Sequence, residues 1–117
     1  MFTIVETEVF RSIWPNYWTA EELGEFCVWL ALNPEGGDVI PRSGGCRKVR
    51  WGVGGRGERS GVRVISFNRR ANGIIWLMTM YGKSIRDNVD AKTLAKIAET
   101  INGKAQRKGA RKVRGRS

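Results

Sequence analysis

The feature that most constrains the fold is the run Ile74–Tyr81, which is apolar at almost every position. It follows Asn72-Gly73, a pair that tolerates positive φ at both residues and marks a tight hairpin turn. The segment before the turn, Val62–Phe67, is rich in β-branched and aromatic residues, which is typical of a strand. The sequence therefore predicts a hairpin whose second strand is central in its sheet and covered on both faces.

Helices are expected over residues 6–14, 19–32 and 90–101, where apolar residues recur at helical spacing. The second begins at a capping box, in which the Thr19 hydroxyl accepts from the third helical amide and Glu22 reaches back to the Thr19 amide. Pro15, Asn33-Pro34 and Asn102-Gly103 are expected to end the three helices.

Two further strands are expected over Phe2–Val5 and Arg47–Trp51, where Val49 and Trp51 alternate with cations. The Gly-rich segments 35–45 and 52–61 are interpreted as loops. The order of elements predicts a small α+β domain with an antiparallel-rich sheet of about four strands. The two N-terminal helices would cover one face, and part of the other face would stay open.

The chain has 117 residues, so we expect one domain over 1–102. Residues 103–117 contain seven basic residues, no acid and one large apolar residue, Val113. This composition predicts a tail that stays disordered until it binds a partner. No apolar run approaches the roughly 20 residues of a membrane-spanning helix, and residues 1–8 do not resemble a signal peptide. We therefore expect a cytoplasmic protein without a membrane partner.

The chain has no His and two cysteines, Cys27 and Cys46. The lack of His excludes His-based acid–base catalysis and a His–metal site, and two cysteines alone do not complete a zinc site. Two reduced thiols, one or both of them buried, are the favoured interpretation. A structural disulfide and a catalytic cysteine stay open as alternatives.

The formal net charge of +10 is unevenly distributed. Residues 1–41 contain seven acids and one basic residue, whereas residues 42–70 contain nine basic residues and one acid. Basic charge is thus concentrated in a central block and in the tail, which favours a polyanionic partner.

A basic surface can be assembled from Lys48 and Arg50 on one strand, Arg63 on the next, and Tyr81 with Lys83 at the end of the last. Arg grips phosphate bidentately, and a Lys crowded by cations has its neutral form favoured, as a general base requires. Such a group can drive attack of an RNA 2′-hydroxyl on the adjacent phosphate. Passive nucleic-acid binding and a merely solvated cationic face are the alternatives, and Tyr81 is more often a core or rim residue.

Three segments in order resemble the RelE/HigB-like toxins of bacterial type II toxin–antitoxin systems, most closely the HigB-like branch. They are NPEGGDVIP with SGGCRKVRW over 33–51, GVRVI over 61–65, and LMTMYGK over 77–83. The resemblance covers about residues 2–102. Arg42, Cys46 and the pair Ser66-Phe67 depart from the usual residues of the family, and the basic tail lies beyond the resemblance.

The resemblance implies a microbial RNase-like α+β fold and ribosome-dependent cleavage of mRNA without metal or cofactor. It also implies neutralisation by an adjacently encoded antitoxin, through which the complex contacts operator DNA. By motif position, the implied catalytic residues are Lys48, Arg50, Arg63, Tyr81 and Lys83. Lys48 or Lys83 would accept the proton, Arg50 and Arg63 would hold the phosphate, and Tyr81 would contact a base. Further RNA contacts are expected from Arg47, Arg56, Arg59, Lys104, Arg107 and Lys108. A non-catalytic nucleic-acid-binding or operon-repressing module is the alternative function.

Overall fold

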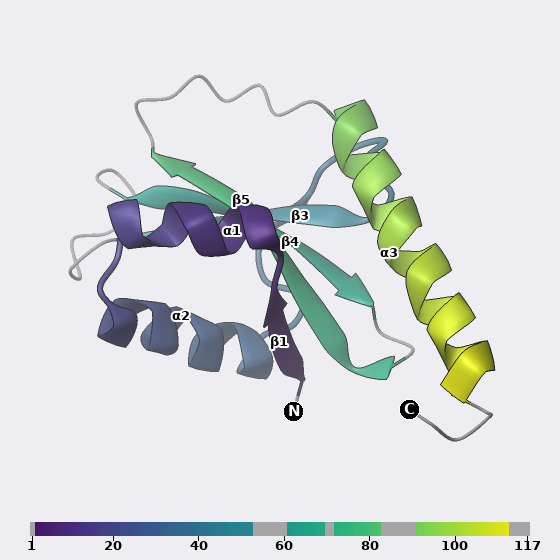
Figure 1. The fold of residues 1–117 in the computed structure, drawn as a ribbon. Helices are drawn as coiled ribbons and strands as arrows, with labels where there is room; N and C mark the ends of the chain where they lie inside the picture. The colour runs from purple at the N-terminus through teal and green to yellow at the C-terminus, as the bar shows by residue number, and fades with distance from the viewer. Residues whose placement is uncertain (1, 53–60, 70–71, 83–90, 113–117) are drawn as a thin grey trace.

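The predicted hairpin forms the middle of the sheet in the computed structural model, which describes residues 2–52, 61–69, 72–82 and 91–112. Strand β4 (Val62–Arg69) pairs antiparallel with β5 (Ile74–Gly82). Gly73 adopts a φ of 68°, in the left-handed region that this turn position requires. The prediction that Ile74–Tyr81 is an interior strand is confirmed, since β5 lies between two neighbours (Figure 1).

The sheet has five strands in the order β1-β5-β4-β3-β2, one more than the sequence predicts. Strand β1 (Thr3–Glu6) runs parallel to β5, and β3 (Cys46–Trp51) runs antiparallel to β4. The additional strand is β2 (Asp38–Val39), which lies in the segment interpreted as a loop and pairs with β3 at the edge of the sheet. Two residues are too few to show an alternating pattern, so this strand leaves no periodic signal in the sequence.

Two N-terminal helices cover one face of the sheet, as predicted (Figure 1). Helix α1 (Glu8–Ile13) is shorter than expected, because its N-cap is Thr7 and the chain tightens into the 3-10 turn Trp14–Asn16. Helix α2 (Ala20–Leu32) has the predicted capping box: the Glu22 amide donates to Thr19 Oγ1 at 3.1 Å, and the Thr19 amide donates to Glu22 Oε1 at 2.8 Å.

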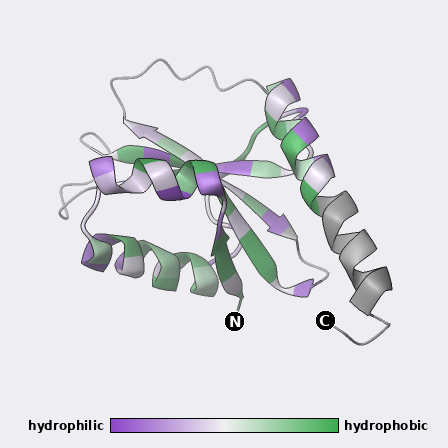
Figure 2. Ribbon diagram, viewed as in Figure 1, coloured by the Kyte–Doolittle hydropathy of each residue, from purple (hydrophilic) through white to green (hydrophobic). Residues whose placement is uncertain are grey.

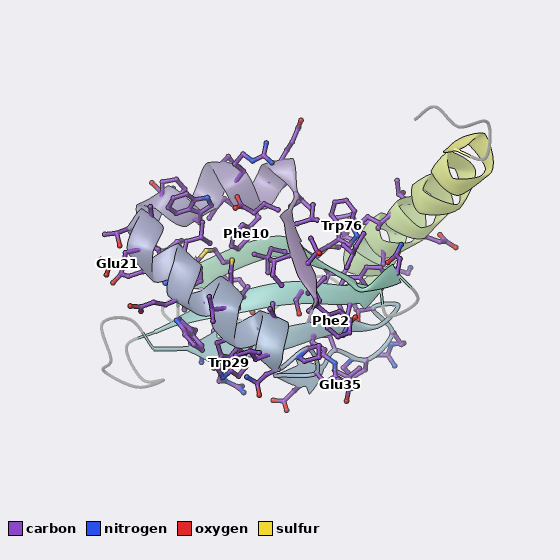
Figure 3. The ribbon with its side chains drawn as sticks, turned by 90° about the horizontal axis from the view of Figure 1, so that it is seen from below. Phe2, Phe10, Glu21, Trp29, Glu35 and Trp76 are labelled. Atoms are coloured by element: carbon purple, nitrogen blue, oxygen red, sulfur yellow. The ribbon has the colours of Figure 1, made fainter. Side chains whose placement is uncertain are left out.

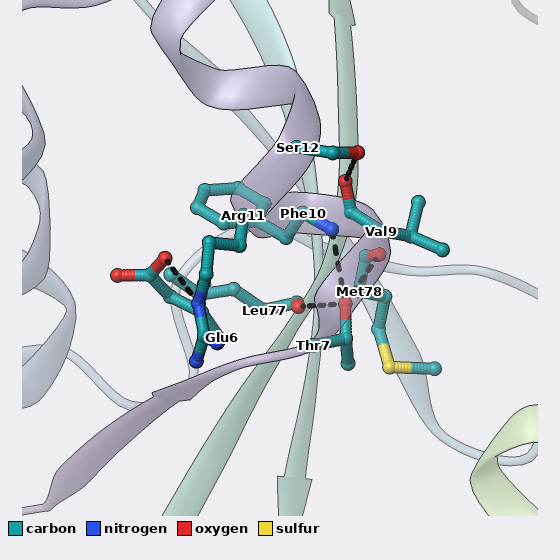
Figure 4. Close-up of polar contacts among 8 residues, drawn as sticks. All are labelled: Glu6, Thr7, Val9, Phe10, Arg11, Ser12, Leu77 and Met78. Carbon is teal, nitrogen blue, oxygen red and sulfur yellow. Dashed lines mark hydrogen bonds and ion pairs between the residues drawn. The ribbon is translucent and has the colours of Figure 1, made fainter.

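Thr7 fastens α1 to the sheet (Figure 4). Its Oγ1 accepts from the Phe10 amide at 3.2 Å and lies within donating distance of two β5 carbonyls, Leu77 at 2.9 Å and Met78 at 3.0 Å. One hydroxyl therefore caps the helix and links it to the strand on which it packs.

The two faces of the sheet carry separate apolar clusters, and hydrophobic residues concentrate in the strands and in α2 (Figure 2). On the α1/α2 face, Phe10 lies between the helices and the sheet, whereas Trp76 lies on the side of α3 (Figure 3). The fully buried Phe10, Phe26 and Leu30 anchor the first cluster. β5 contributes to both clusters, which accounts for its nearly continuous hydrophobicity.

Helix α3 (Ala91–Lys112) packs on the second face through Leu94, Ala98 and Ile101. The helix continues through Asn102-Gly103, so the expectation that this pair ends it was wrong. The residues from Lys104 to Lys108 are nearly all strong helix formers, and one glycine costs a helix only about 1 kcal/mol. The division of the chain into a domain over 1–102 and a basic tail over 103–117 stays a prediction. No helix in the described part of the chain is long and apolar enough to cross a membrane.

Candidate active site

One cross-strand row places three of the predicted catalytic residues side by side. Arg50 on β3 is the Cα partner of Arg63 on β4, and Arg63 is in turn the partner of Tyr81 on β5. Directly opposite residues of antiparallel strands project from the same face, with Cβ atoms about 5 Å apart. The row Arg50–Arg63–Tyr81 therefore spans three strands on one face of the sheet.

Lys48 joins this row from the neighbouring position on the same face. It precedes Arg50 by two residues on β3 and pairs with Ile65 on β4. Residues two apart in a strand point to the same side. The structure thus brings Lys48, Arg50, Arg63 and Tyr81 together, and we call these four residues the cationic row.

The cationic row occupies the part of the second face next to the apolar cluster beneath α3. Along β4, Phe67 and Ile65 are buried in that cluster, and Arg63 follows at the next position on the face. Along β3, Cys46 is buried in the cluster and Lys48 follows. Tyr81 is half-buried and packs against the edge of the same cluster. On this face β3 and β4 therefore pass from apolar to cationic residues beyond the cluster, and β5 contributes Tyr81 beside them.

Arg63 is the most unusual member of the cationic row. Its Nη1 is buried and has no hydrogen-bond partner in the described part of the protein. A buried donor of a charged group that stays unpaired costs more than the 1–3 kcal/mol of a neutral one. Its like-charged neighbour Arg50 on the adjacent strand adds to this cost. The local arrangement therefore favours an incoming anion over the empty site.

Arg50 differs because it already has an acidic neighbour. Its Nη1 donates to Asp38 Oδ2 at 3.4 Å, and the two side chains are 39% and 79% exposed. Asp38 was not among the site residues predicted from the sequence, although glycines 36 and 37 before it are typical of a turn that leads into a strand.

Arg47, expected to contact RNA, lies outside the cationic row. It alternates with Lys48 along β3 and so projects from the opposite face. Its Nη1 donates to the backbone carbonyls of Glu35 at 2.9 Å and Gly37 at 3.1 Å. These bonds tie the segment before β2 to β3, which gives Arg47 a structural role.

The other predicted site residues cannot be placed. Lys83, Arg56 and Arg59, together with the side chains of Lys104, Arg107 and Lys108, lie outside what the structure describes.

Both cysteines are free thiols, as favoured by the sequence analysis, and they belong to different faces of the sheet. Burial, followed by the nearby Glu6 carboxylate, raises the pKa of Cys27 to about 11. Burial likewise raises the pKa of Cys46, although a hydrogen bond with Ser43 opposes the shift. Both groups are thus protonated at neutral pH, which argues against the catalytic-cysteine alternative.

Comparison with solved structures identifies the fold. The chain resembles a chain of the intact E. coli RelBE toxin–antitoxin complex, with a TM-score of 0.57 and 16% sequence identity. The match covers 74% of this chain and 100% of the other. No protein-family model matches the sequence. The protein therefore has the RelE-like α+β fold that was expected.

Proposed function

We propose that this protein is the toxin of a type II toxin–antitoxin system, in the HigB-like branch, and that it cleaves mRNA on the ribosome without metal or cofactor. The proposal combines the RelE-like fold with the cationic row on the α3 face of the sheet. The observation that carries it is the buried Nη1 of Arg63, which has no partner among the described residues, since an anion would supply the acceptor that they do not.

RNA phosphate is the anion for which every residue of the cationic row has a proposed role. In the proposed step, Lys48 or Lys83 takes the proton from a 2′-hydroxyl, whose oxygen attacks the adjacent phosphorus. The bond from phosphorus to the 5′-oxygen breaks, and that oxygen leaves after it takes up a proton from the lysine ammonium group or from water. The products are a 2′,3′-cyclic phosphate and a 5′-hydroxyl.

Three members of the row would support this step. Arg63 and Arg50 would hold the phosphate and stabilise the charge that develops on it, because guanidinium forks bind phosphate oxygens in pairs. Tyr81 would stack on a neighbouring base and so fix the position of the scissile linkage.

The proposal extends to the partners that the resemblance to these toxins implies. An adjacently encoded antitoxin with acidic and apolar segments would neutralise the cationic row, and it would carry any contact with operator DNA. We place the toxin–antitoxin pair in the cytoplasm, where ribosomes and mRNA are found.

The test is inducible expression of the protein without its neighbouring gene. The unsubstituted chain is expected to arrest growth and to produce new mRNA 5′ ends within reading frames. Arg63→Ala is expected to abolish both effects while leaving the circular dichroism spectrum unchanged. Primer extension with and without ribosomes would then show whether cleavage depends on the ribosome.

Arg11→Ala is the matched control, because it also removes one positive charge but lies on α1, where its side chain is 67% exposed. It is expected to behave like the unsubstituted chain. Growth arrest that survives Arg63→Ala would contradict catalysis at the row. Operator or RNA binding without new 5′ ends would favour the non-catalytic nucleic-acid-binding or operon-repressing module instead.

A further inference from the structure

The edge strand β2 places a carboxylate beside the cationic row. Asp38 is the Cα partner of Lys48, so it shares the face on which Lys48 and Arg50 lie. Its Oδ2 lies 3.4 Å from Arg50 Nη1. The one acidic residue of β2 therefore engages one of the two guanidinium groups that the proposed function assigns to phosphate.

The backbone holds Asp38 in this position. Gly37, immediately before it, has a φ of 89°, and a Cβ there would lie 2.5 Å from the Lys48 carbonyl oxygen. Only glycine fits so close an approach in this conformation. From the other face, Arg47 donates to the carbonyls of Glu35 and Gly37. The carboxylate is thus presented by an anchored strand rather than by a freely placed loop.

The contact between Asp38 and Arg50 is nevertheless easy to displace. A donor–acceptor distance of 3.4 Å is long for a charge-assisted hydrogen bond, and both side chains are exposed, Asp38 more than Arg50. A phosphate held by two guanidinium nitrogens forms shorter and stronger bonds. The two arginines are therefore unequal: Arg63 has an unmet donor, whereas Arg50 is already occupied.

We propose that Asp38 competes with RNA for Arg50, an inference that rests on the proposed function of the cationic row. In the free protein Asp38 holds the exposed guanidinium of Arg50. RNA engages Arg50 only by displacing the Asp38 carboxylate. The competition weakens binding of the substrate without taking part in the chemical step.

Asp38→Asn tests this inference, since it keeps the size of the side chain and removes its charge. Cleavage of mRNA on programmed ribosomes is followed over a range of protein concentrations. We expect the half-saturating concentration to fall about threefold, as for loss of an exposed ion pair, with the maximal rate unchanged. If Asp38 merely supported the fold, Asp38→Asn would instead lower the maximal rate or the melting temperature.

Glu25→Gln is the matched control, because it makes the same charge change on the exposed side of α2, in the opposite layer. It is expected to leave both kinetic constants unchanged. Arg50→Ala supplies the second control. In that background Asp38→Asn is expected to change the half-saturating concentration by less than 1.5-fold, because the guanidinium group for which Asp38 and RNA compete is absent.

The outcomes separate the two proposals. If the unsubstituted chain cleaves nothing, the proposed function fails and this inference fails with it. If cleavage occurs and is lost in Arg63→Ala, the function stands. In that case, two results would overturn this inference while the proposed function stands. One is an Asp38→Asn variant with the same half-saturating concentration as Glu25→Gln. The other is an equal fall in the half-saturating concentration when Asp38→Asn is made in the Arg50→Ala background.

Discussion

Tyr81 shares a sheet face with Arg63 because β5 contains one residue more than its partner at this point. Ile65 pairs with Thr79, but the next residue, Ser66, pairs with Leu77, so Met78 is the extra residue of a β-bulge. Below the bulge, Trp76 lies on the α3 face and Leu77 on the α1/α2 face. Without the extra residue, strict alternation from Trp76 would turn Tyr81 away from the cationic row.

This placement predicts how Tyr81 responds to substitution. If its ring stacks on an RNA base, Tyr81→Phe keeps the stacking surface and retains cleavage close to that of the unsubstituted chain. Tyr81→Ala removes the ring and is expected to lower cleavage by roughly ten- to a hundredfold, as base stacking contributes about 1–3 kcal/mol. Single-turnover cleavage on programmed ribosomes measures both. A large loss in Tyr81→Phe would instead assign the role to the hydroxyl, as a proton donor.

Substitutions of Arg47 and Arg50 are expected to affect different properties, stability in one case and cleavage in the other, although the two residues are close in sequence. Arg47→Ala removes two hydrogen bonds to backbone carbonyls and is expected to destabilise the fold by about 1–2 kcal/mol. Its cleavage per folded molecule should stay near that of the unsubstituted chain. Arg50→Ala should retain stability and cleave mRNA more slowly, with cleavage that is still measurable because Arg63 continues to hold the phosphate. Thermal unfolding and cleavage assays on both variants distinguish the two roles. Loss of cleavage in an Arg47→Ala variant of full stability would support the predicted contact between Arg47 and RNA.

Thr7→Ala is expected to be among the more destabilising polar substitutions. It removes the N-cap of α1 together with the link to the β5 carbonyls of Leu77 and Met78. Caps of this kind contribute about 1–2 kcal/mol. Urea unfolding should show the loss. Ser12→Ala serves as the control, because the exposed Ser12 only donates to the Val9 carbonyl within α1; an equal effect of both substitutions would argue against the role of Thr7.

The raised pKa of Cys27 predicts a loss of stability in alkaline solution. Its usual pKa is 9.0 and burial raises it to about 11, so the folded state favours the protonated thiol. The resulting stability is fully present below pH 9 and declines as the pH rises towards 11. Cys27→Ala should flatten the decline in the free energy of unfolding between pH 9 and 11, although Cys46 adds a contribution of the same sign. Urea unfolding at a series of pH values measures the slope of the free energy of unfolding against pH. An equal slope in Cys27→Ala and in the unsubstituted chain would contradict the raised pKa of Cys27.

The local elements were predictable because their signals lie within a few residues of one another. The capping box of Thr19 and Glu22 marks the start of α2, and Asn72-Gly73 marks the turn between β4 and β5. The alternation of Lys48 and Arg50 with Val49 identifies the polar side of β3. The end of α3 was missed, because a single glycine is a weak stop when strong helix formers follow.

The amino-acid sequence by itself determined the helices, the hairpin and the presence of cations on alternate positions, because capping, turn geometry and side-chain periodicity act over short distances. Only the tertiary structure decided which residues meet. Strand register makes Arg50, Arg63 and Tyr81 neighbours, the bulge at Met78 sets the face of Tyr81, and the pairing of β2 brings Asp38 to Arg50. Such relationships depend on pairing between segments far apart in the chain, and a shift of one residue would reverse every side chain of a strand.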